Sequence, residues 1–468
     1  MTQLTKRFSW LVYLLLISAL VWPVLAQDET PIPLVHTVQE GENLTFIAEQ
    51  YEVTVADLLV LNGLSEEAIL WVGQELIIPG GEGEAVFAVH TAVSGDTLAT
   101  IARSYNTGVA ELLAVNQAIN PHFQPPIGQR VTVVSRTGST SPLPPPTGQP
   151  HLVQAGDTPL SIAAQHGLSP LQIATTNGLD YPTYLYQGQR LRIPVGERVY
   201  RDLPGSWVDV AVRPLPVRPG QTLSIYVENM AEGQPAGQLA GQTLQFSPHE
   251  DGYVALIGFD AFTEPGDYLL ELTGPDTLGW SPLSQPITLQ PGDFGTEFIN
   301  VPDDQVALLE PSIRENEDAF LDTIYTQFEP EQFWEGLFQV PVTNTIVTSV
   351  YGNSRSYNGG PFEIFHTGVD FGGTIGTPIL APAAGVVVYT GNLELRGRVV
   401  VINHGLGVMT AYFHLSDIFV AEGDVVTTGQ TVAAGGNTGL STGPHLHWDL
   451  RIMGTAVNPL QWTETAFP

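Results

Sequence analysis

At 468 residues the chain is too long for one ordinary domain, and roughly three to four domains are expected. A hydrophobic content of 43% supports packed cores, while 48 glycines and 37 prolines favour β-structure with many turns over helical bundles. The net charge of −32 argues against binding to nucleic acid or to anionic lipid. Because no cysteine is present, disulfides are excluded, and any zinc site must use histidine and carboxylate ligands.

The N-terminus has the pattern of a cleaved export signal over residues 1–26. Lys6 and Arg7 make a positive start, residues 11–20 are apolar, and Ala26 is a small residue before the expected cut. We therefore expect export to the periplasm, the cell wall or the extracellular space, with no stable membrane span after cleavage. The alternative is a retained membrane anchor, for which the apolar run is short.

Three copies of one pattern follow, over residues 34–79, 88–134 and 149–195. In each copy a glycine precedes an isoleucine by six residues and an asparagine by 21. The residues concerned are Gly41, Ile47 and Asn62, then Gly95, Ile101 and Asn116, then Gly156, Ile162 and Asn177. Each copy predicts a small α+β module in the order strand, helix, helix, strand. The turn after the glycine caps the first helix, and the asparagine ends the second, where a left-handed residue is tolerated.

The repeated pattern resembles LysM modules. The resemblance implies binding of N-acetylglucosamine chains of peptidoglycan or chitin, in a groove between the first turn and the loop before the second strand. The glycan-binding candidates that it carries over are Gly41, Asn43, Gly95, Asp96, Thr97, Gly156, Asp157 and Thr158. Copy three departs from the family at Pro159, where the others have leucine, which leaves its sugar contacts open. The alternative is that these residues only shape turns, although three weak sites on one chain can add avidity.

The sequence of the middle of the chain shows no catalytic motif and predicts a linker, a β domain and a connector. Residues 135–148 are rich in proline, serine and threonine, which is typical of a semi-extended linker. Over residues 199–295, short apolar runs separated by Pro-Gly turns predict an all-β immunoglobulin-like sandwich. Residues 296–340 predict an acidic helical connector, with a plug over the active site as the alternative.

The chemistry is concentrated in residues 341–468, which predict a mainly antiparallel β domain. Over residues 445–452, apolar residues alternate with His445, His447, Asp449 and Arg451. This is a half-buried strand whose two histidines point the same way, so both can reach one metal ion or one substrate.

Two other segments add residues of the same kind. His366 and Asp370 lie four residues apart in a glycine-rich strand context and are expected to face the same side. Tyr412 and His414 are expected to share the strand face opposite to the core residues of their segment. By contrast, His404 follows a buried apolar run and is interpreted as a turn histidine.

These motifs, at residues 366–370, 412–415 and 441–447, resemble the lysostaphin/LytM-type zinc metallopeptidases that cut peptidoglycan cross-bridges. The resemblance implies one Zn²⁺ per chain bound by His366, Asp370 and His447. It makes His414 and His445 the catalytic histidines that do not bind the metal. From the strand pattern we add Asp449 as a candidate that holds a metal ligand in place without binding the metal itself. We also add Tyr412 as a candidate donor to the oxyanion.

The favoured function is therefore an exported zinc endopeptidase that hydrolyses peptide cross-links of peptidoglycan and is held to the wall glycan by its LysM modules. One alternative is a non-catalytic LysM/LytM factor that binds peptidoglycan and activates another wall hydrolase. That class usually lacks metal ligands, and none is missing here. Another is a structural wall or spore-coat component, which would not need His414 or His445. The sequence leaves open which bond is cut, a glycine bridge or a D-alanyl–diaminopimelate bond.

Overall fold

The computed structural model describes residues 35–39, 42–51, 53–62, 64, 70, 75–78, 86–121, 124–135, 141–180, 182–275 and 280–468. The predicted signal over residues 1–26 and the glycan candidate Gly41 lie outside the described residues. Among the residues that are described, no helix has the length and apolar character needed to cross a membrane.

The predicted order of strand, helix, helix, strand is confirmed in all three repeats. The first contains β1 (Val35–Thr37), α1 (Leu44–Gln50), α2 (Val55–Asn62) and β2 (Glu75–Ile77); the second contains β3 (Val86–Thr91), α3 (Leu98–Ser104), α4 (Val109–Val115) and β4 (Arg130–Ser135); the third contains β5 (Gln149–Leu152), α5 (Pro159–Gln165), α6 (Pro170–Thr176) and β6 (Arg190–Ile193). In each repeat the two strands pair antiparallel. The repeated isoleucine of each first helix is fully buried in its own small core.

In repeats two and three the asparagine that ends the second helix does not use the left-handed conformation that is tolerated there. Its φ is −132° at Asn116 and −103° at Asn177. The side-chain amide instead ties the helix to the last strand. Asn116 donates to the carbonyl of Thr132 at 2.6 Å and accepts from its N–H at 2.9 Å. Asn177 makes the same pair of bonds with Arg192.

Two four-stranded antiparallel sheets form the middle of the molecule. One has the order β10 (Gln242–Thr243), β9 (Ala236–Leu239), β13 (Gly266–Thr273), β14 (Leu283–Leu289), and the other β11 (Ser247–His249), β12 (Gly252–Gly258), β8 (Thr222–Asn229), β7 (Trp207–Arg213). Buried side chains of both sheets, such as Trp207 and Leu270, belong to one core. The predicted all-β organisation is therefore present, and its immunoglobulin-like topology stays a prediction.

The predicted acidic connector is helical only in its middle part. It begins with a strand, β15 (Thr296–Ile299), continues through a 3₁₀ helix at Val306–Leu309 and forms α7 (Pro311–Tyr325). No helix follows between Thr326 and Val340. The strand forms because residues 296–299 pair parallel with β17 (Ser354–Tyr357), a contact that the local pattern does not reveal.

An eight-stranded sheet organises the C-terminal part. The strands in order are β16 (Val347–Ser349), β19 (Gly368–Gly372), β27 (His445–Ile452), β23 (Val408–Leu415), β22 (Gly397–Gly405), β21 (Gly385–Leu393) and β25 (Val425–Val426), and β28 (Thr455–Val457) pairs with β27. Every pair in this sheet is antiparallel, as predicted. Smaller elements are β18 (Ile364–Phe365), β20 (Pro378–Leu380), β24 (Asp417–Ile418), β26 (Thr431–Ala434) and α8 (Gln461–Glu464).

Both faces of this sheet are covered, which explains why every residue of β23 is buried. On one face α7 packs Leu321 and Ile324 against Met409 and Phe413. On the other face Tyr412 lies in a core that also contains residues of β20 and β26.

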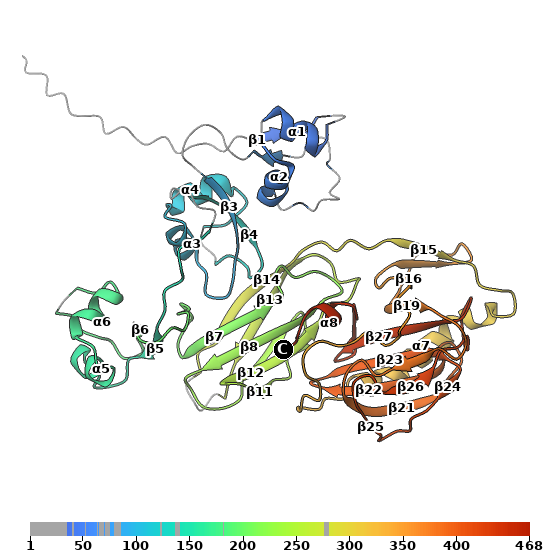
Figure 1. Ribbon diagram of the computed structural model, residues 1–468. Coiled ribbons are helices and arrows are strands. Elements are labelled where there is room, and N and C mark those ends of the chain that lie inside the picture. The colour runs from blue at the N-terminus through green and yellow to red at the C-terminus, as the bar shows by residue number, and fades with distance from the viewer. Residues whose placement is uncertain are drawn as a thin grey trace, which may run out of the picture.

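The parts of the molecule make specific contacts with each other (Figure 1). Thr222 of β8 exchanges two hydrogen bonds with the Gln461 side chain, and its hydroxyl accepts from the indole of Trp462 at 2.9 Å. The second repeat lies beside β13 and β14 in Figure 1, and an isolated bridge joins Ile127 to Ile287.

Candidate metal centre and active site

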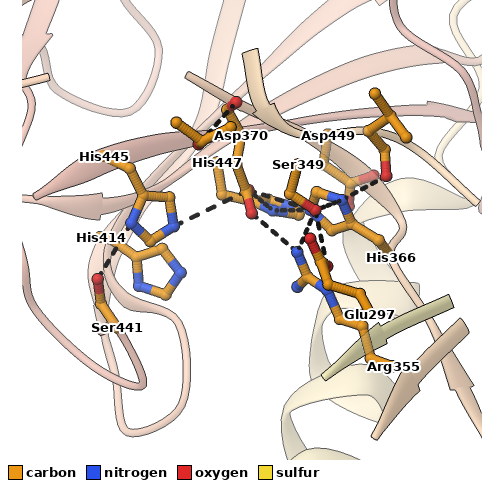
Figure 2. Close-up of polar contacts among 12 residues, drawn as sticks. Glu297, Ser349, Arg355, His366, Asp370, His414, Ser441, His445, His447 and Asp449 are labelled. Carbon is orange, nitrogen blue, oxygen red and sulfur yellow. Dashed lines mark hydrogen bonds and ion pairs between the residues drawn. The ribbon is translucent and has the colours of Figure 1, made fainter. Parts of the chain in front are cut away.

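Three side chains, two from neighbouring strands and one from the segment before β19, meet at one point on the α7 face of the large sheet (Figure 2). Asp370 of β19 lies directly opposite His447 of β27 in the strand register, and His366 precedes β19. The Nδ1 atom of His447 is 2.8 Å from Asp370 Oδ1 and 3.0 Å from His366 Nε2. Asp370 Oδ1 is also 3.0 Å from His366 Nε2. These are the three residues that the sequence predicts to share one ion.

The donor set suits a divalent metal ion. Two imidazole nitrogens and one carboxylate oxygen lie within 4.8 Å of one another, and all three residues are buried. Their separations approach the ~3.3 Å expected for ligands about 2.0 Å from a tetrahedral zinc ion. Two facing imidazole nitrogens need a shared proton or cation between them, which further favours a metal.

Neighbouring groups fix which nitrogen of each ligand faces the site. The Nδ1 of His366 donates to the carbonyl of Val350 at 2.8 Å, so its Nε2 keeps the lone pair. The Nε2 of His447 is buried without a hydrogen-bond partner. It lies where a side chain at Gly368 would sit, because an added Cβ there would be only 2.8 Å away. Glycine at this position therefore leaves room for the His447 ring.

Arg355 holds the third ligand from behind. Its Nη2 donates to Asp370 Oδ2 at 2.8 Å, so that Oδ1 is turned toward the two histidines. Burial works to raise the pKa of Asp370, but His366 and His447 hold this pKa well below its usual value. Asp370 is therefore ionised at neutral pH, as a metal ligand must be.

The two predicted catalytic histidines lie beside this cluster, and in both rings Nδ1 is hydrogen-bonded to a backbone carbonyl. The rings of His414 and His445 are 4.8 Å apart, and His445 Nε2 is 3.8 Å from Asp370 Oδ1. His445 Nδ1 donates to the carbonyl of Gly443 at 2.8 Å, and His414 Nδ1 donates to that of Thr438 at 2.7 Å. Each ring therefore keeps its Nε2 lone pair free to accept a proton.

Burial decides the charge of His414. Desolvation, with smaller effects of His445 and His447, lowers the pKa of His414 to about 3. Its imidazole is thus neutral at physiological pH and can act as a proton acceptor. Burial likewise lowers the pKa of His447 to about 3, which keeps this ring neutral and able to bind a metal.

The prediction that Tyr412 shares a face with His414 is wrong. Tyr412 is fully buried in the core on the other side of the sheet, where its hydroxyl bonds to Thr410 Oγ1 at 2.8 Å. His414 has a φ of +60°, a left-handed conformation that interrupts the alternation and returns its ring to the face of His447. Tyr412 is therefore not an oxyanion donor in this arrangement.

His404 is a strand residue, not the predicted turn residue. It lies in β22 and is fully buried, with Nδ1 bonded to the carbonyl of Ala384 and Nε2 to Thr410 Oγ1, both at 2.8 Å. Together with Tyr412 it forms a hydrogen-bonded chain inside the core.

Asp449 lies on the same strand face as His447 but is paired with Arg451. The guanidinium donates to Asp449 Oδ2 at 2.9 and 3.0 Å, and the other carboxylate oxygen has no hydrogen-bond partner. Within the part of the chain that the structure describes, Asp449 makes no hydrogen bond to a ligand histidine, so its role behind the metal stays a prediction. Sequence reasoning assigned no role to groups that do touch the ligands, among them Arg355, the Ser349 hydroxyl and the carbonyl of Val350.

The predicted glycan candidates of repeats one and three shape turns. Asn43 caps α1 by accepting from the N–H of Phe46 at 2.9 Å, and Thr158 caps α5. Asp157 accepts from His151 at 2.9 Å and from the N–H of Gln154 at 2.8 Å. The turn of repeat three nevertheless stays open, because nothing lies within 4 Å of an added Cβ at Gly156.

In repeat two the same turn is covered. Gly95 is buried, and its N–H donates to the Gln285 side chain. The loop before β4 also docks on β14, since Ile127 exchanges backbone hydrogen bonds with Pro286 and Thr288 at 2.7 and 2.8 Å. Asp96 bonds to His90, and Thr97 caps α3. Both sides of the predicted groove of this repeat therefore contact the two-sheet part of the molecule.

Comparison with protein families divides the chain in a way that agrees with these elements. Residues 36–79, 90–134 and 151–194 match the model of the LysM domain, and residues 364–459 match the model of peptidase family M23. The second match includes every residue of the metal cluster and both of the histidines predicted to be catalytic.

Relatives resemble the C-terminal part. The chain is 48% identical over 96 residues to the peptidoglycan DD-endopeptidase ShyA of Vibrio cholerae, covering 20% of this chain and 22% of that protein. It is 46% identical over 95 residues to the DD-carboxypeptidase/endopeptidase Mpg of Neisseria meningitidis, covering 20% of this chain and 22% of that protein. The chain thus spans only about a fifth of the length of these relatives.

A solved structure called a putative peptidase M23 from Pseudomonas aeruginosa aligns with 53% of this chain and 96% of that chain. The sequence identity is 26% and the TM-score 0.41. The family matches and the geometry of the site lead to one conclusion: the chain carries three LysM domains and a C-terminal domain of peptidase family M23.

Proposed function

We propose that this protein is an exported zinc-dependent endopeptidase that hydrolyses peptide cross-links of peptidoglycan and is held on the wall glycan by LysM domains. The observation that carries the proposal is the meeting of His366, Asp370 and His447 with two further histidines beside them. The names of the relatives support peptidoglycan as the substrate class.

The residues of the chain divide the work as follows. His366, Asp370 and His447 would hold the zinc ion. When bound, zinc supplies Lewis-acid activation of water and of the scissile carbonyl near neutral pH. His445, whose Nε2 lies 3.8 Å from Asp370 Oδ1, accepts a proton from the attacking water and returns it to the leaving amine. His414 stands beside it, and because its Nδ1 already donates to the Thr438 carbonyl, its Nε2 offers a second lone pair that can accept the proton instead.

The site also has room for an extended peptide. An open cavity of about 570 Å³ is lined by residues 343–344 and 373–378. It adjoins the strand end that carries His445, because the N–H of Gly373 donates to the carbonyl of Pro444. We place one arm of the cross-linked peptide in this cavity.

The anchoring role falls on the third repeat rather than the second. Repeat two has both sides of its groove against β14 and neighbouring residues. Repeat three has an open turn at Gly156 and two exposed aromatic rings, Tyr184 at 89% and Tyr186 at 76% exposure, in the loop before β6. Exposed aromatic rings stack on sugar faces, so this repeat is the better glycan binder.

The proposal is tested by metal content together with mass spectrometry of products released from two defined peptidoglycans, one with glycine bridges and one with direct D-alanyl–diaminopimelate links. We expect about one zinc per chain and new peptide termini from one substrate. His447→Ala should lose the metal. His445→Ala should keep the metal but lose roughly 100-fold or more in cleavage rate. Cleavage by His445→Ala at the wild-type rate would falsify its role.

A further inference from the structure

The segment before the peptidase domain reaches into the site at several points. Residues 296–325 lie outside the region that matches peptidase family M23, which begins at residue 364. Even so, β15, the 3₁₀ segment and α7 run along the domain that holds the metal cluster. Three polar side chains of this segment, Glu297, Gln305 and Glu317, contact groups that in turn touch the catalytic residues.

Glu297 braces the support of a metal ligand. The parallel pairing of β15 with β17 places Glu297 directly opposite Arg355. Its Oε2 accepts from Arg355 Nε at 2.9 Å and from the Ser349 hydroxyl at 2.8 Å. Figure 2 shows the guanidinium of Arg355 between Glu297 and Asp370. Glu297 therefore sets the direction from which Arg355 holds Asp370, and it offsets a buried positive charge next to the metal site.

Gln305 braces the turn that presents His445. Its side-chain amide makes two hydrogen bonds with the backbone of Ser441, donating to the carbonyl and accepting from the N–H, each at 3.2 Å. The hydroxyl of Ser441 lies 3.1 Å from His445 Nδ1 and bonds to the carbonyl of Gly443 at 2.8 Å. That carbonyl also fixes the tautomer of His445. Gln305 is thus two contacts away from the proposed base.

Glu317 of α7 braces the loop beside His414. Its carboxylate accepts from the N–H of Leu395 at 2.8 Å and from Arg396 Nη1 at 3.0 Å. The carbonyl of Arg396 accepts from the N–H of His414 at 3.0 Å. The left-handed backbone of His414 is therefore held by a loop that α7 itself holds in place.

We propose that residues 296–325 form a built-in part of the catalytic site, in which Glu297 positions the metal ligand Asp370 and Gln305 positions the base His445. Both are positioning residues, because each acts through one other side chain or turn. The inference rests on the proposed metallopeptidase function. It assigns separate effects to the two residues: Glu297 serves metal affinity, and Gln305 serves the chemical step.

The first arm of the test measures zinc affinity of the full chain by competition with a chromophoric chelator. Glu297→Gln keeps the side-chain shape but removes the charge that balances Arg355. We expect zinc to bind about 10-fold more weakly, which is the usual loss when a group behind a ligand is altered. Asp304→Asn removes one charge from an exposed position of the same segment and should bind zinc like the wild type.

The second arm measures kcat and KM on a defined cross-linked peptide with saturating zinc. Gln305→Ala should lower kcat by about 10-fold, while KM and zinc affinity stay within about 2-fold of wild type. Gln305→Glu can still accept from the N–H of Ser441 but cannot donate to its carbonyl. Its kcat should therefore lie between those of the wild type and Gln305→Ala.

Each outcome decides the matter. Wild-type zinc affinity in Glu297→Gln, or wild-type kcat in Gln305→Ala, would overturn the assignment of that residue while leaving the peptidase intact. Absence of zinc binding and cleavage in the wild-type protein would instead overturn the proposed function. Circular dichroism checks folding. If Glu297→Gln does not fold, Glu297→Asp replaces it, because aspartate keeps the charge on a shorter side chain. Zinc affinity of Glu297→Asp below that of Asp304→Asn would support the role of Glu297, and equal affinity would overturn it.

Discussion

A single backbone angle determines which face of the sheet His414 serves. Side chains along a strand alternate between faces, and Tyr412 and His414 would therefore point the same way in a regular strand. The register between β22 and β23 shifts in this region, and His414 has a φ of +60°. Residues with a β-carbon rarely adopt this conformation, and it persists only where surroundings hold it. The result is a histidine beside the metal cluster and a tyrosine in the opposite core.

Because Tyr412 faces away from the site, its hydroxyl should be dispensable for cleavage. We expect Tyr412→Phe to retain zinc and to keep kcat/KM within about 2-fold of wild type. Stability should fall by about 1 kcal/mol, the usual contribution of one buried hydrogen bond, since Thr410 keeps its bond to His404. Steady-state kinetics and urea unfolding measure both quantities. A kcat/KM at least 10-fold lower would return Tyr412 to the catalytic machinery.

His404 should make the domain sensitive to acid. Burial lowers the pKa of His404 to about 4, whereas an unfolded histidine titrates near 6.5. Between these pH values the unfolded chain binds a proton that the folded chain does not, so the free energy of unfolding falls as the pH falls from about 6.5 to about 4. The loss amounts to roughly 3 kcal/mol.

The measurement is urea unfolding of the full chain from pH 7 to pH 4, compared with His404→Gln. Glutamine cannot titrate, so the variant should lose less stability over this range even if it is less stable at pH 7. Parallel pH dependences of the two proteins would show that His404 does not stay neutral in the folded state.

The five histidine and aspartate residues of the site could be predicted because each lies in a short motif that resembles a known family, at residues 366–370, 412–415 and 441–447. The alternation of β27 adds that His445 and His447 share one face. Their supports could not be predicted in the same way. Glu297 and Arg355 are 58 residues apart, and their contact depends on a parallel pairing that no local pattern encodes. The face of Tyr412 was missed because periodicity does not reveal a residue with positive φ.

At the scale of elements, α7 completes the core of the peptidase domain. Leu321, Ile324 and Tyr325 are buried against β22 and β23, and Arg451 lies over the ring of Tyr325 at 5.0 Å. The helical spacing of apolar residues predicted a helix, but not that its apolar face covers the strands beside the site. A boundary at residue 341, as the sequence suggests, would therefore leave an apolar sheet face uncovered.

Two fragments of the chain test this view. A fragment of residues 341–468 should be aggregated or loosely packed, because the residues under α7 would face water. A fragment of residues 294–468 should be soluble and bind zinc, although it loses the contacts with Thr222. Size-exclusion chromatography, near-ultraviolet circular dichroism and zinc titration make the comparison. A compact, zinc-binding fragment of residues 341–468 would show that α7 is not needed for folding.

At the scale of the whole molecule, repeats two and three share one sequence pattern but differ in what their turns and loops contact. Repeat two contributes Ile127 to the core of the two-sheet part, and Gln285 bonds to both sides of its groove. Repeat three keeps its turn open, and its loop before β6 presents two tyrosines to solvent. The departure at Pro159 does not disturb the module, because proline fits the first turn of α5. One repeat thus joins the domains, and another keeps the exposed loop on which the proposed glycan binding depends.

This difference predicts where binding to the wall will be lost. We expect Tyr184→Ser with Tyr186→Ser to lower the fraction of the full chain that pellets with insoluble peptidoglycan by at least about 3-fold, since a multivalent binder loses avidity with each site. Gln124→Ala changes an exposed residue at the position of Tyr184 in repeat two and should pellet like the wild type. Cleavage of a short soluble peptide should be unchanged in both variants, because neither position lies in the peptidase domain. If the tyrosine variant pellets normally while Gln124→Ala does not, the glycan groove belongs to repeat two, and its contacts with β14 must open on binding.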